Sequence, residues 1–280
     1  MTGRIDLHTH SAASDGTYSP SELARLAEGT GLCAIALTDH DNNDGIEEFM
    51  DECGRLGIEG IPGIEISTDY EKPIHIVGLY SRGAEFDKTV KRLKNARVKR
   101  NKQMFEKIRR YGFDVTEEDI LENGRVSVEH AGRLHMANAL VRKGYAADKN
   151  EAFDRFLMRG RPCYAEKFSL SPEESVKLIK RCGGIAIWAH PALAMDNEKD
   201  MLEMAERLKS AGLDAMECLY STYTEKMSRL CRNTAEKAGL LMSGGSDFHG
   251  ANKPDVRLGE VNGGFVPYEI LEKLKERISI

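Results

Sequence analysis

The sequence contains no long hydrophobic run. None of its 280 residues belong to a stretch of 18 consecutive apolar residues, so the chain is not expected to span a membrane. The residues after Met1 also lack the apolar segment of a secretory signal peptide. We therefore expect a globular protein with no membrane partner, located in the cytoplasm.

Paired cysteine motifs and an excess of basic charge are missing as well. The six cysteines are scattered, and no two form a Cys-x-x-Cys pair. This pattern predicts reduced, mostly buried thiols rather than a disulfide framework. The formal net charge is −5 and the pI is about 6.0, whereas proteins that coat nucleic acids are usually basic. No stable nucleic-acid partner is expected, although a small nucleotide or a short strand end stays open as a substrate.

Short apolar runs alternate with amphipathic helical patterns in both halves of the chain. Strands are predicted near residues 4–10, 33–37, 74–78, 184–189, 214–219 and 240–242. Ser19-Pro20-Ser21-Glu22 and Ser171-Pro172-Glu173-Glu174 are capping boxes with proline at the first helical position. This alternation predicts an α/β fold with a parallel sheet, open or closed into a barrel.

The middle of the chain shows helical patterns without clear strands between them. A long basic helix is predicted over residues 91–110, and further helices over 128–143 and 148–157. We interpret residues 96–167 as a helical cap insertion beside a sheet domain formed by residues 1–95 and 168–280. Most of the basic residues in the insertion are expected on an ordinary solvated face.

Two histidines end the first predicted strand. Residues i and i+2 of a strand point to the same face, so His8 and His10 would aim their imidazoles in one direction. Neutral imidazole is the commonest protein metal ligand. Taken alone, the pair fits a metal site and an exposed polar strand end equally well.

The remaining strand ends favour the metal site. Six of the eight histidines fall at predicted strands or strand ends, and three carboxylates share those locations. Unpaired, these groups would be costly to desolvate, and the imidazoles would repel one another when protonated. A set of imidazoles and carboxylates without thiolate suits Mn, Fe or Zn, and its size predicts two or three divalent ions. The predicted ligands are His8, His10, Asp15, His40, Glu65, His75, His190, Asp247 and His249.

Several of these motifs, taken in order, resemble those of the PHP (polymerase and histidinol phosphatase) superfamily. The matching segments are His8-Thr9-His10, Thr38-Asp39-His40, Gly63-Ile64-Glu65, His75, Ala189-His190-Pro191 and Ser246-Asp247-Phe248-His249. The resemblance implies a distorted (β/α)7 TIM-like barrel with a trinuclear metal centre. It also implies three ligand groups: His8, His10, Glu65 and Asp247; Glu65, His75 and His190; Asp15, His40 and His249.

The same resemblance points to substrate-binding residues in the cap. Related enzymes carry an Arg and a His suited to the substrate phosphate where this chain has Arg133 and His135. Both are predicted catalytic residues, and both are predicted to bind substrate together with Arg161 and Lys167. Protonated His135 and a metal-bound water are the two candidate proton donors to the leaving oxygen. The alternatives are that Arg133 pairs with Glu129 or Asp119 and that His135 packs inside the cap. For Glu217, Asp39 and Asp6 we expect structural or ligand-orienting roles.

The closest resemblance is to stand-alone phosphoesterases that act on nucleoside phosphates. We therefore expect a metal-dependent phosphoric monoester hydrolase acting on a small phosphorylated metabolite, most plainly AMP or a 3′,5′-nucleoside bisphosphate, through attack by a metal-bridging hydroxide. Histidinol-phosphate phosphatase and an exonuclease on short oligonucleotides are the alternatives. A non-catalytic binding module would show a decayed ligand set, whereas all nine positions are filled here.

Overall fold

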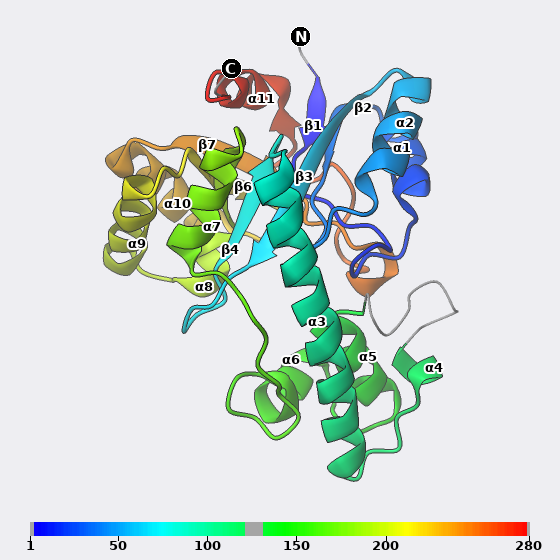
Figure 1. The fold of residues 1–280 in the computed structure, drawn as a ribbon. Coiled ribbons are helices and arrows are strands. Elements are labelled where there is room, and N and C mark those ends of the chain that lie inside the picture. The colour runs from blue at the N-terminus through cyan, green and yellow to red at the C-terminus, as the bar shows by residue number, and fades with distance from the viewer. Residues whose placement is uncertain (1–2, 121–130, 279–280) are drawn as a thin grey trace.

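The computed structural model describes residues 3–120 and 131–278, which form a sheet-based lobe and a smaller helical lobe joined by one long helix (Figure 1). The strands are β1 (Arg4–Asp6), β2 (Leu32–Leu37), β3 (Glu59–Ser67), β4 (His75–Leu79), β5 (Ile185–Ala189), β6 (Ala215–Tyr220), β7 (Leu241–Gly245) and β8 (Val266–Pro267). The helices are α1 (Pro20–Gly29), α2 (Ile46–Leu56), α3 (Ala84–Arg110), α4 (Glu117–Ile120), α5 (Arg133–Arg142), α6 (Lys149–Ala152), α7 (Pro172–Arg181), α8 (Pro191–Ala194), α9 (Glu198–Ser210), α10 (Glu225–Ala238) and α11 (Tyr268–Lys275).

The eight strands form one sheet in the order β7-β6-β5-β4-β3-β2-β1-β8. Strands β1 to β3 are parallel, as are β5 to β7, whereas β4 runs antiparallel to both of its neighbours and β8 antiparallel to β1. Beyond β1 and β7 the chain segments bond to each other: Asp247 N donates to His8 O (2.8 Å) and His10 N donates to Phe248 O (3.0 Å). The sheet is thereby nearly closed, and the predicted distorted TIM-like barrel is confirmed. The antiparallel β4 is its main distortion.

Gly245 permits this closure. A Cβ atom at residue 245 would lie 2.5 Å from Cβ of His8 and 2.6 Å from its backbone nitrogen. Contacts this short are not tolerated, so only glycine lets the end of β7 approach the segment that carries the first histidine.

The first predicted strand is shorter than expected. It ends at Asp6, and His8 and His10 follow it rather than lie in it. The Asp6 carboxylate accepts the backbone N–H groups of His8 (3.3 Å), Ser246 (2.9 Å) and Gly259 (2.8 Å). A side chain therefore takes the donors that a continuing ladder would use, and the chain turns toward the centre of the barrel end.

Both predicted capping boxes are present. Ser19 Oγ accepts from Glu22 N while the Glu22 carboxylate accepts from Ser19 N, and Ser171 and Glu174 repeat this arrangement at the start of α7. Each box satisfies two N–H groups that a helix start leaves unbonded, and losing such a cap costs about 1 kcal/mol. These local signals explain why α1 and α7 begin where the sequence predicts.

Helix α3 connects the two lobes. It runs without interruption over 27 residues, about 40 Å at 1.5 Å per residue, and begins seven residues before the predicted start at 91. Val90 and Leu93 pack in a core with Trp188, whereas Met104 and Ile108 belong to the core of the helical lobe. The domain division at residues 95 and 96 stays a prediction, and in the structure it falls within this helix.

Two further expectations concern the helices. The helix predicted over 128–143 begins in a segment outside the described residues, and its described part, α5, spans Arg133–Arg142. The helix predicted over 148–157 is α6 followed by a π-helical turn, Phe153–Leu157. Across residues 3–120 and 131–278, no helix combines the length and apolar content needed to cross a bilayer.

Candidate metal centre and substrate pocket

The barrel gathers the nine predicted ligands at one end. The parallel strands deliver His8, His10, His40, His190, Asp247 and His249 just past their carboxyl ends. Strand β4 is antiparallel, so its first residue reaches the same end: His75 is paired in the ladder with Ser67, the last residue of β3. Glu65 itself lies inside β3 rather than after a strand, and its carboxylate is fully buried.

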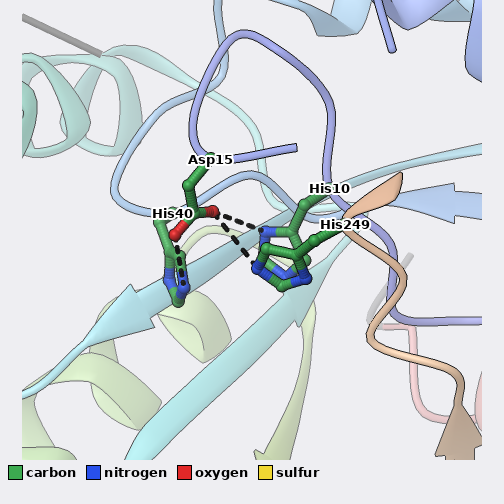
Figure 2. A group of neighbouring side chains, drawn as sticks. All are labelled: His10, Asp15, His40 and His249. Atoms are coloured by element: carbon green, nitrogen blue, oxygen red, sulfur yellow. Dashed lines mark ion pairs between the residues drawn. The ribbon is translucent and has the colours of Figure 1, made fainter. Parts of the chain in front are cut away.

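Three groups of these side chains place potential ligand atoms within 4.8 Å of one another. One group contains the four residues drawn in Figure 2, where Asp15 lies between three histidines. The groups are His10, Asp15, His40 and His249; His8, His10, Glu65 and Asp247; and His40, Glu65 and His75. His190 adjoins the third group, since its Nε2 lies 2.9 Å from Glu65 Oε1.

Glu65 is the centre of the cluster. Five imidazoles from four different parts of the barrel approach its two oxygens: Oε1 lies 2.7 Å from His75 Nδ1 and 2.9 Å from His190 Nε2, and Oε2 lies 3.1 to 3.2 Å from His40 Nδ1, His8 Nε2 and His10 Nε2. A carboxylate in this position is suited to bridge two metal ions.

The chemistry of the donor set fits divalent metal. His8 Nε2, both ring nitrogens of His10 and Glu65 Oε2 are buried and have no hydrogen-bond partner among the described residues. Such orphaned atoms are rare in native interiors and call for a bound group. Because the donors are imidazole and carboxylate without thiolate, the residues fit Mn, Fe or Zn rather than a structural thiolate site.

The electrostatics of the cluster reflect its dense packing. Burial opposes protonation of His10, but the adjacent carboxylates of Asp247 and Glu65 outweigh it and raise the pKa of His10 to about 9. Burial, together with the charges of Lys253 and His10, lowers the pKa of His249 to about 4. Burial would raise the pKa of Asp15, yet His40 and His249 hold it well below its usual range. The carboxylates are therefore ionised at neutral pH.

Further carboxylate contacts orient the ligands. His8 Nδ1 donates to Glu217 Oε1 (2.8 Å), which leaves Nε2 directed at the cluster, and Glu217 Oε2 accepts from His190 N (2.6 Å). Asp247 Oδ2 accepts from Tyr220 Oη and from Lys253 Nζ, both at 2.5 Å, so its Oδ1 is left for the histidines. Glu217 thus has the orienting role expected for it.

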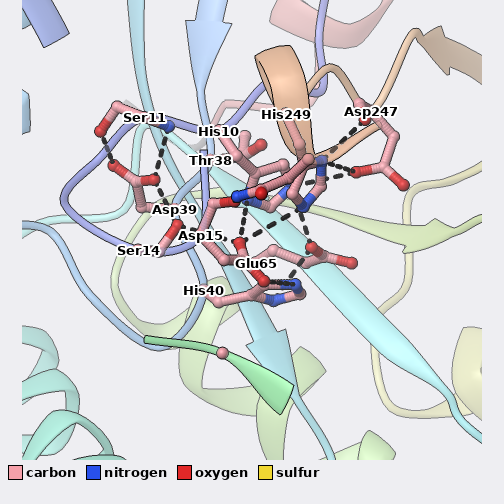
Figure 3. Close-up of polar contacts among 12 residues, drawn as sticks. His10, Ser11, Ser14, Asp15, Thr38, Asp39, His40, Glu65, Asp247 and His249 are labelled. Atoms are coloured by element: carbon pink, nitrogen blue, oxygen red, sulfur yellow. Dashed lines mark hydrogen bonds and ion pairs between the residues drawn. The ribbon is translucent and has the colours of Figure 1, made fainter. Parts of the chain in front are cut away.

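Asp39 organises the loop that carries Asp15 (Figure 3). It accepts hydrogen bonds from Ser11 N (2.8 Å), Ser11 Oγ (2.6 Å) and Ser14 Oγ (2.5 Å). These contacts fold residues 11–15 back toward His40, and they place Asp15 on the side of the cluster opposite Asp247.

Backbone strain collects at the same end of the barrel. Asp41, His190 and Asp247 have φ values of 53°, 33° and 55°, in the left-handed region that non-glycine residues rarely occupy. A strained backbone conformation of this kind is maintained where many surrounding contacts hold it in place, as they do around this cluster.

A cavity of about 600 Å³ opens beside the cluster. Asp15, His40, His75 and His249 line its floor, and residues of the helical lobe line its walls. Of the substrate residues predicted from the sequence, Arg133 and Lys167 line this cavity, whereas Arg161 is exposed and lies outside the lining.

His135 also lies outside the cavity lining. It is 2% exposed, and its Nδ1 accepts the N–H of Gly132 (3.0 Å), an arrangement that caps the start of α5. Its Nε2 lies 3.1 Å from Nδ2 of Asn252, and its role in proton transfer stays a prediction. Asp119, one alternative partner for Arg133, pairs with Lys143 (2.9 Å), and the other, Glu129, is outside the described residues.

Two arginines of α3 were not singled out from the sequence. Arg97 and Arg100 are 7% and 4% exposed and line the cavity. They occupy the buried stripe of α3 between Leu93 and Met104, at helical spacing. In the turns before and after them, the same face of α3 is apolar. A charged residue on such a face is the signal that would have identified them.

Comparison with known proteins agrees with this geometry. The profile of the PHP domain matches residues 6–158. A 5′-3′ exoribonuclease of Haemophilus influenzae is 34% identical over 259 residues, covering 89% of this chain and 91% of the relative. A 3′,5′-nucleoside bisphosphate phosphatase of Chromobacterium violaceum is 31% identical over 250 residues, covering 88% and 87%.

Two solved structures are similar over nearly their whole length. One, described as an amidohydrolase of Chromobacterium violaceum with bound sulfate and no metal, has a TM-score of 0.85 at 28% identity and covers 99% of this chain and 97% of its own. The other, from Bifidobacterium adolescentis, is described as a metal-dependent phosphoesterase and has a TM-score of 0.81 at 26% identity, covering 99% and 96%.

The barrel and its histidine–carboxylate cluster define a metal-binding hydrolase of the phosphoesterase class. More particularly, the chain belongs to the PHP domain family.

Proposed function

We propose that this protein hydrolyses the phosphomonoester of a small nucleotide, with a 3′,5′-nucleoside bisphosphate preferred and AMP also accepted. The observation that carries the proposal is a single cavity that joins the histidine–carboxylate cluster to buried arginines. One phosphate of the substrate would bind at the histidine–carboxylate cluster, and a second phosphate would bind at the buried arginines. A cavity of about 600 Å³ suits a molecule the size of one nucleotide.

The arginine wall carries uncompensated positive charge. Among the described residues, Asp41 is the one carboxylate outside the metal cluster that forms an ion pair with any of Arg97, Arg100, Arg133 and Lys167. Burial, reinforced by Arg97 and Arg133, holds the pKa of Arg100 well below its usual range, and its Nη2 has no hydrogen bond in the described structure. Buried cations of this kind are stabilised by an anion, and the guanidinium fork matches phosphate.

Metal ions held by the cluster would supply Lewis-acid polarisation of a phosphoryl oxygen and a lowered pKa for water. The protein's own groups do the rest. Glu217 holds His8 in orientation, and the cap cations bind the remote phosphate. The name of the Chromobacterium relative, a bisphosphate phosphatase, supports this substrate class.

A phosphate-release assay over a panel of substrates tests the function. Purified protein is supplied with Mn²⁺, Fe²⁺ or Zn²⁺ and given 3′,5′-nucleoside bisphosphates, AMP, histidinol phosphate and sugar phosphates. We expect the highest kcat/KM with a bisphosphate and a lower value with AMP. Absence of phosphate release from every nucleotide with all three metals would contradict the proposal, and a preference for histidinol phosphate would replace it.

An exonuclease on short oligonucleotides is the second candidate, favoured by the Haemophilus relative, which carries that activity in its name. Short 5′-phosphorylated RNA separates the two when nucleotide products are followed together with phosphate, because an exonuclease releases mononucleotides, whereas a strict monoesterase releases only inorganic phosphate and leaves the strand intact. We also infer a cytoplasmic location, which the six free cysteines support.

Arg100→Met is expected to raise KM for a nucleoside bisphosphate by about tenfold to a hundredfold, because the substrate would lose one or two charge-assisted hydrogen bonds. KM for p-nitrophenyl phosphate, which lacks a second phosphate, should change by less than about threefold. Lys99→Met, an exposed neighbour on the same helix, is the matched control. Steady-state kinetics on the three proteins checks this, and equal effects on both substrates would contradict an Arg100 contact with the second phosphate.

A further inference from the structure

Asp41 is a buried carboxylate beside the metal centre that belongs to no ligand group. It directly follows His40 and is fully buried. Its Oδ1 accepts from Ser67 N (2.9 Å), and its Oδ2 accepts from Lys167 Nζ (2.9 Å) and from Arg97 Nη1 (3.3 Å). Within residues 3–120 and 131–278, its side-chain hydrogen bonds are therefore to barrel backbone on one oxygen and to cap cations on the other.

These partners lie on the two segments that connect the lobes and at the end of a barrel strand. Arg97 is on α3, along which the chain enters the helical lobe, and Lys167 is on the segment by which the chain leaves it. Ser67 ends β3, the strand that carries Glu65, and Asp41 N donates to Glu65 O (2.9 Å). One carboxylate thus links both chain crossings to the strand at the centre of the metal cluster.

The backbone conformation of Asp41 is energetically unfavourable, so the contacts of its side chain must hold it in place. Its φ of 53° is left-handed, a conformation that aspartate tolerates better than most residues but that remains uncommon. The conformation directs the carboxylate away from the cluster formed around His40 and toward the cap cations.

We infer that Asp41 is a positioning residue that holds Arg97 and Lys167 in the orientation that receives the substrate's second phosphate. The inference rests on the proposed function for its substrate. Arg97 lines the cavity and, held by Asp41 through Nη1, keeps its Nε without a hydrogen bond to the described residues. Lys167 is held between Asp41 and the carbonyl of Ser67 (3.4 Å), at the cavity wall.

Two physical effects oppose each other at this position. Removing the carboxylate leaves the cavity wall more positive, which would strengthen its attraction for any anion. It also frees two long side chains, and arginine and lysine lose the most rotamer entropy when they are ordered. A guanidinium binds phosphate well only when its fork is oriented, so loss of orientation outweighs the gain in charge for a substrate of fixed shape.

The test compares Asp41→Asn with Asp44→Asn. Asp44 lies on the same loop and pairs with Lys94 of the same helix, but this pair is partly exposed and is not part of the cavity lining. With a nucleoside bisphosphate, Asp41→Asn is expected to raise KM about tenfold or more while kcat falls less than about threefold and metal content is unchanged. With p-nitrophenyl phosphate, KM should stay within about twofold, and Asp44→Asn should match wild type on both substrates.

A lower KM in Asp41→Asn would overturn the inference, because Asp41 would then compete with the substrate instead of positioning its ligands. Equal loss on both substrates would overturn it too. Lys167→Met provides a second variant: it should reproduce the bisphosphate effect, and the double variant should be no worse than either single one, whereas additive effects count against a shared role.

Amide hydrogen exchange keeps the inference separate from the proposed function. If wild-type protein releases no phosphate from any nucleotide, the proposed function fails, but the role of Asp41 can still be measured. Asp41→Asn should then accelerate exchange in residues 159–170 and at Asp69, whose N–H donates to Leu170 O (2.7 Å), while Asp44→Asn should not. Unchanged exchange in Asp41→Asn would contradict its positioning role.

Discussion

Glu65→Gln is expected to lower kcat/KM roughly a thousandfold and to reduce the metal content of the protein. The carboxylate of Glu65 is fully buried and is approached by five imidazoles, two at Oε1 and three at Oε2. Glutamine keeps the shape but offers one oxygen, and its amide hydrogens would point at ring nitrogens or at a bound cation. No neighbouring carboxylate can replace it, since Asp15 and Asp247 lie on opposite sides of the cluster.

Phosphate release and elemental analysis of metals, measured on the same preparation, check this prediction. Glu59→Gln is the matched control, because Glu59 lies on the same strand but at its other end, where it pairs with Lys275 and Tyr268. The control should retain wild-type metal content and activity within about twofold. A Glu65→Gln protein with full metal content and near-normal turnover would show that Glu65 is a structural partner of the histidines and not a ligand.

Glu217→Gln is expected to weaken metal binding by about tenfold to a hundredfold, the usual effect of losing a contact that orients a ligand. One oxygen of Glu217 accepts from His8 Nδ1 and the other from His190 N. A glutamine amide can accept at only one of the two positions, so whichever way it is turned, one N–H donor faces another. Either His8 loses the hydrogen bond that directs its Nε2 to the cluster, or the strained backbone of His190 loses its support.

A titration of activity with Mn²⁺ separates the two variants. Excess Mn²⁺ should restore most of the kcat of Glu217→Gln, because the ligands themselves are intact and only their preorganisation is reduced. The same excess should not restore Glu65→Gln. If Glu217→Gln shows a normal metal titration with a reduced kcat, Glu217 acts on the reaction rather than on the geometry of His8.

The ligand positions could be predicted from the sequence because they depend on local rules. An apolar run predicts a strand, parallel strands deliver the residues after them to one end of a sheet, and a histidine or carboxylate just past the run is readily identified. His8, His40, His190 and Asp247 follow this rule, and the structure brings them together. His75 does not follow this rule. Strand β4 is antiparallel, so its first residue and not its last reaches the site, and the sequence pattern of β4 does not reveal this direction.

The substrate side of the pocket could be predicted only in part, because it depends on which faces two lobes bury against each other. Arg133 and Lys167 line the cavity, whereas Arg161 is exposed and His135 is buried with its Nδ1 at the start of α5. A basic stretch alone does not distinguish a solvated arginine from a buried one, since Arg161 and Arg100 both lie in one; only the place of Arg100 in the apolar stripe of α3 sets it apart. The distinction arises from the packing of α3 against both lobes.

The sequence by itself therefore determined the alternation of strands and helices, the helix starts set by capping boxes, and the candidate ligands of the metal centre, since periodicity, hydrogen-bonding chemistry and strand-end placement are all short-range properties. The closed barrel was implied only by the resemblance to the PHP superfamily. The tertiary structure alone decided how the barrel closes through Gly245, that five imidazoles converge on Glu65, and that Asp41, Arg97 and Arg100 meet at the boundary of the lobes. These features require residues far apart in the chain to come within a few ångströms, and only the packed fold brings them there.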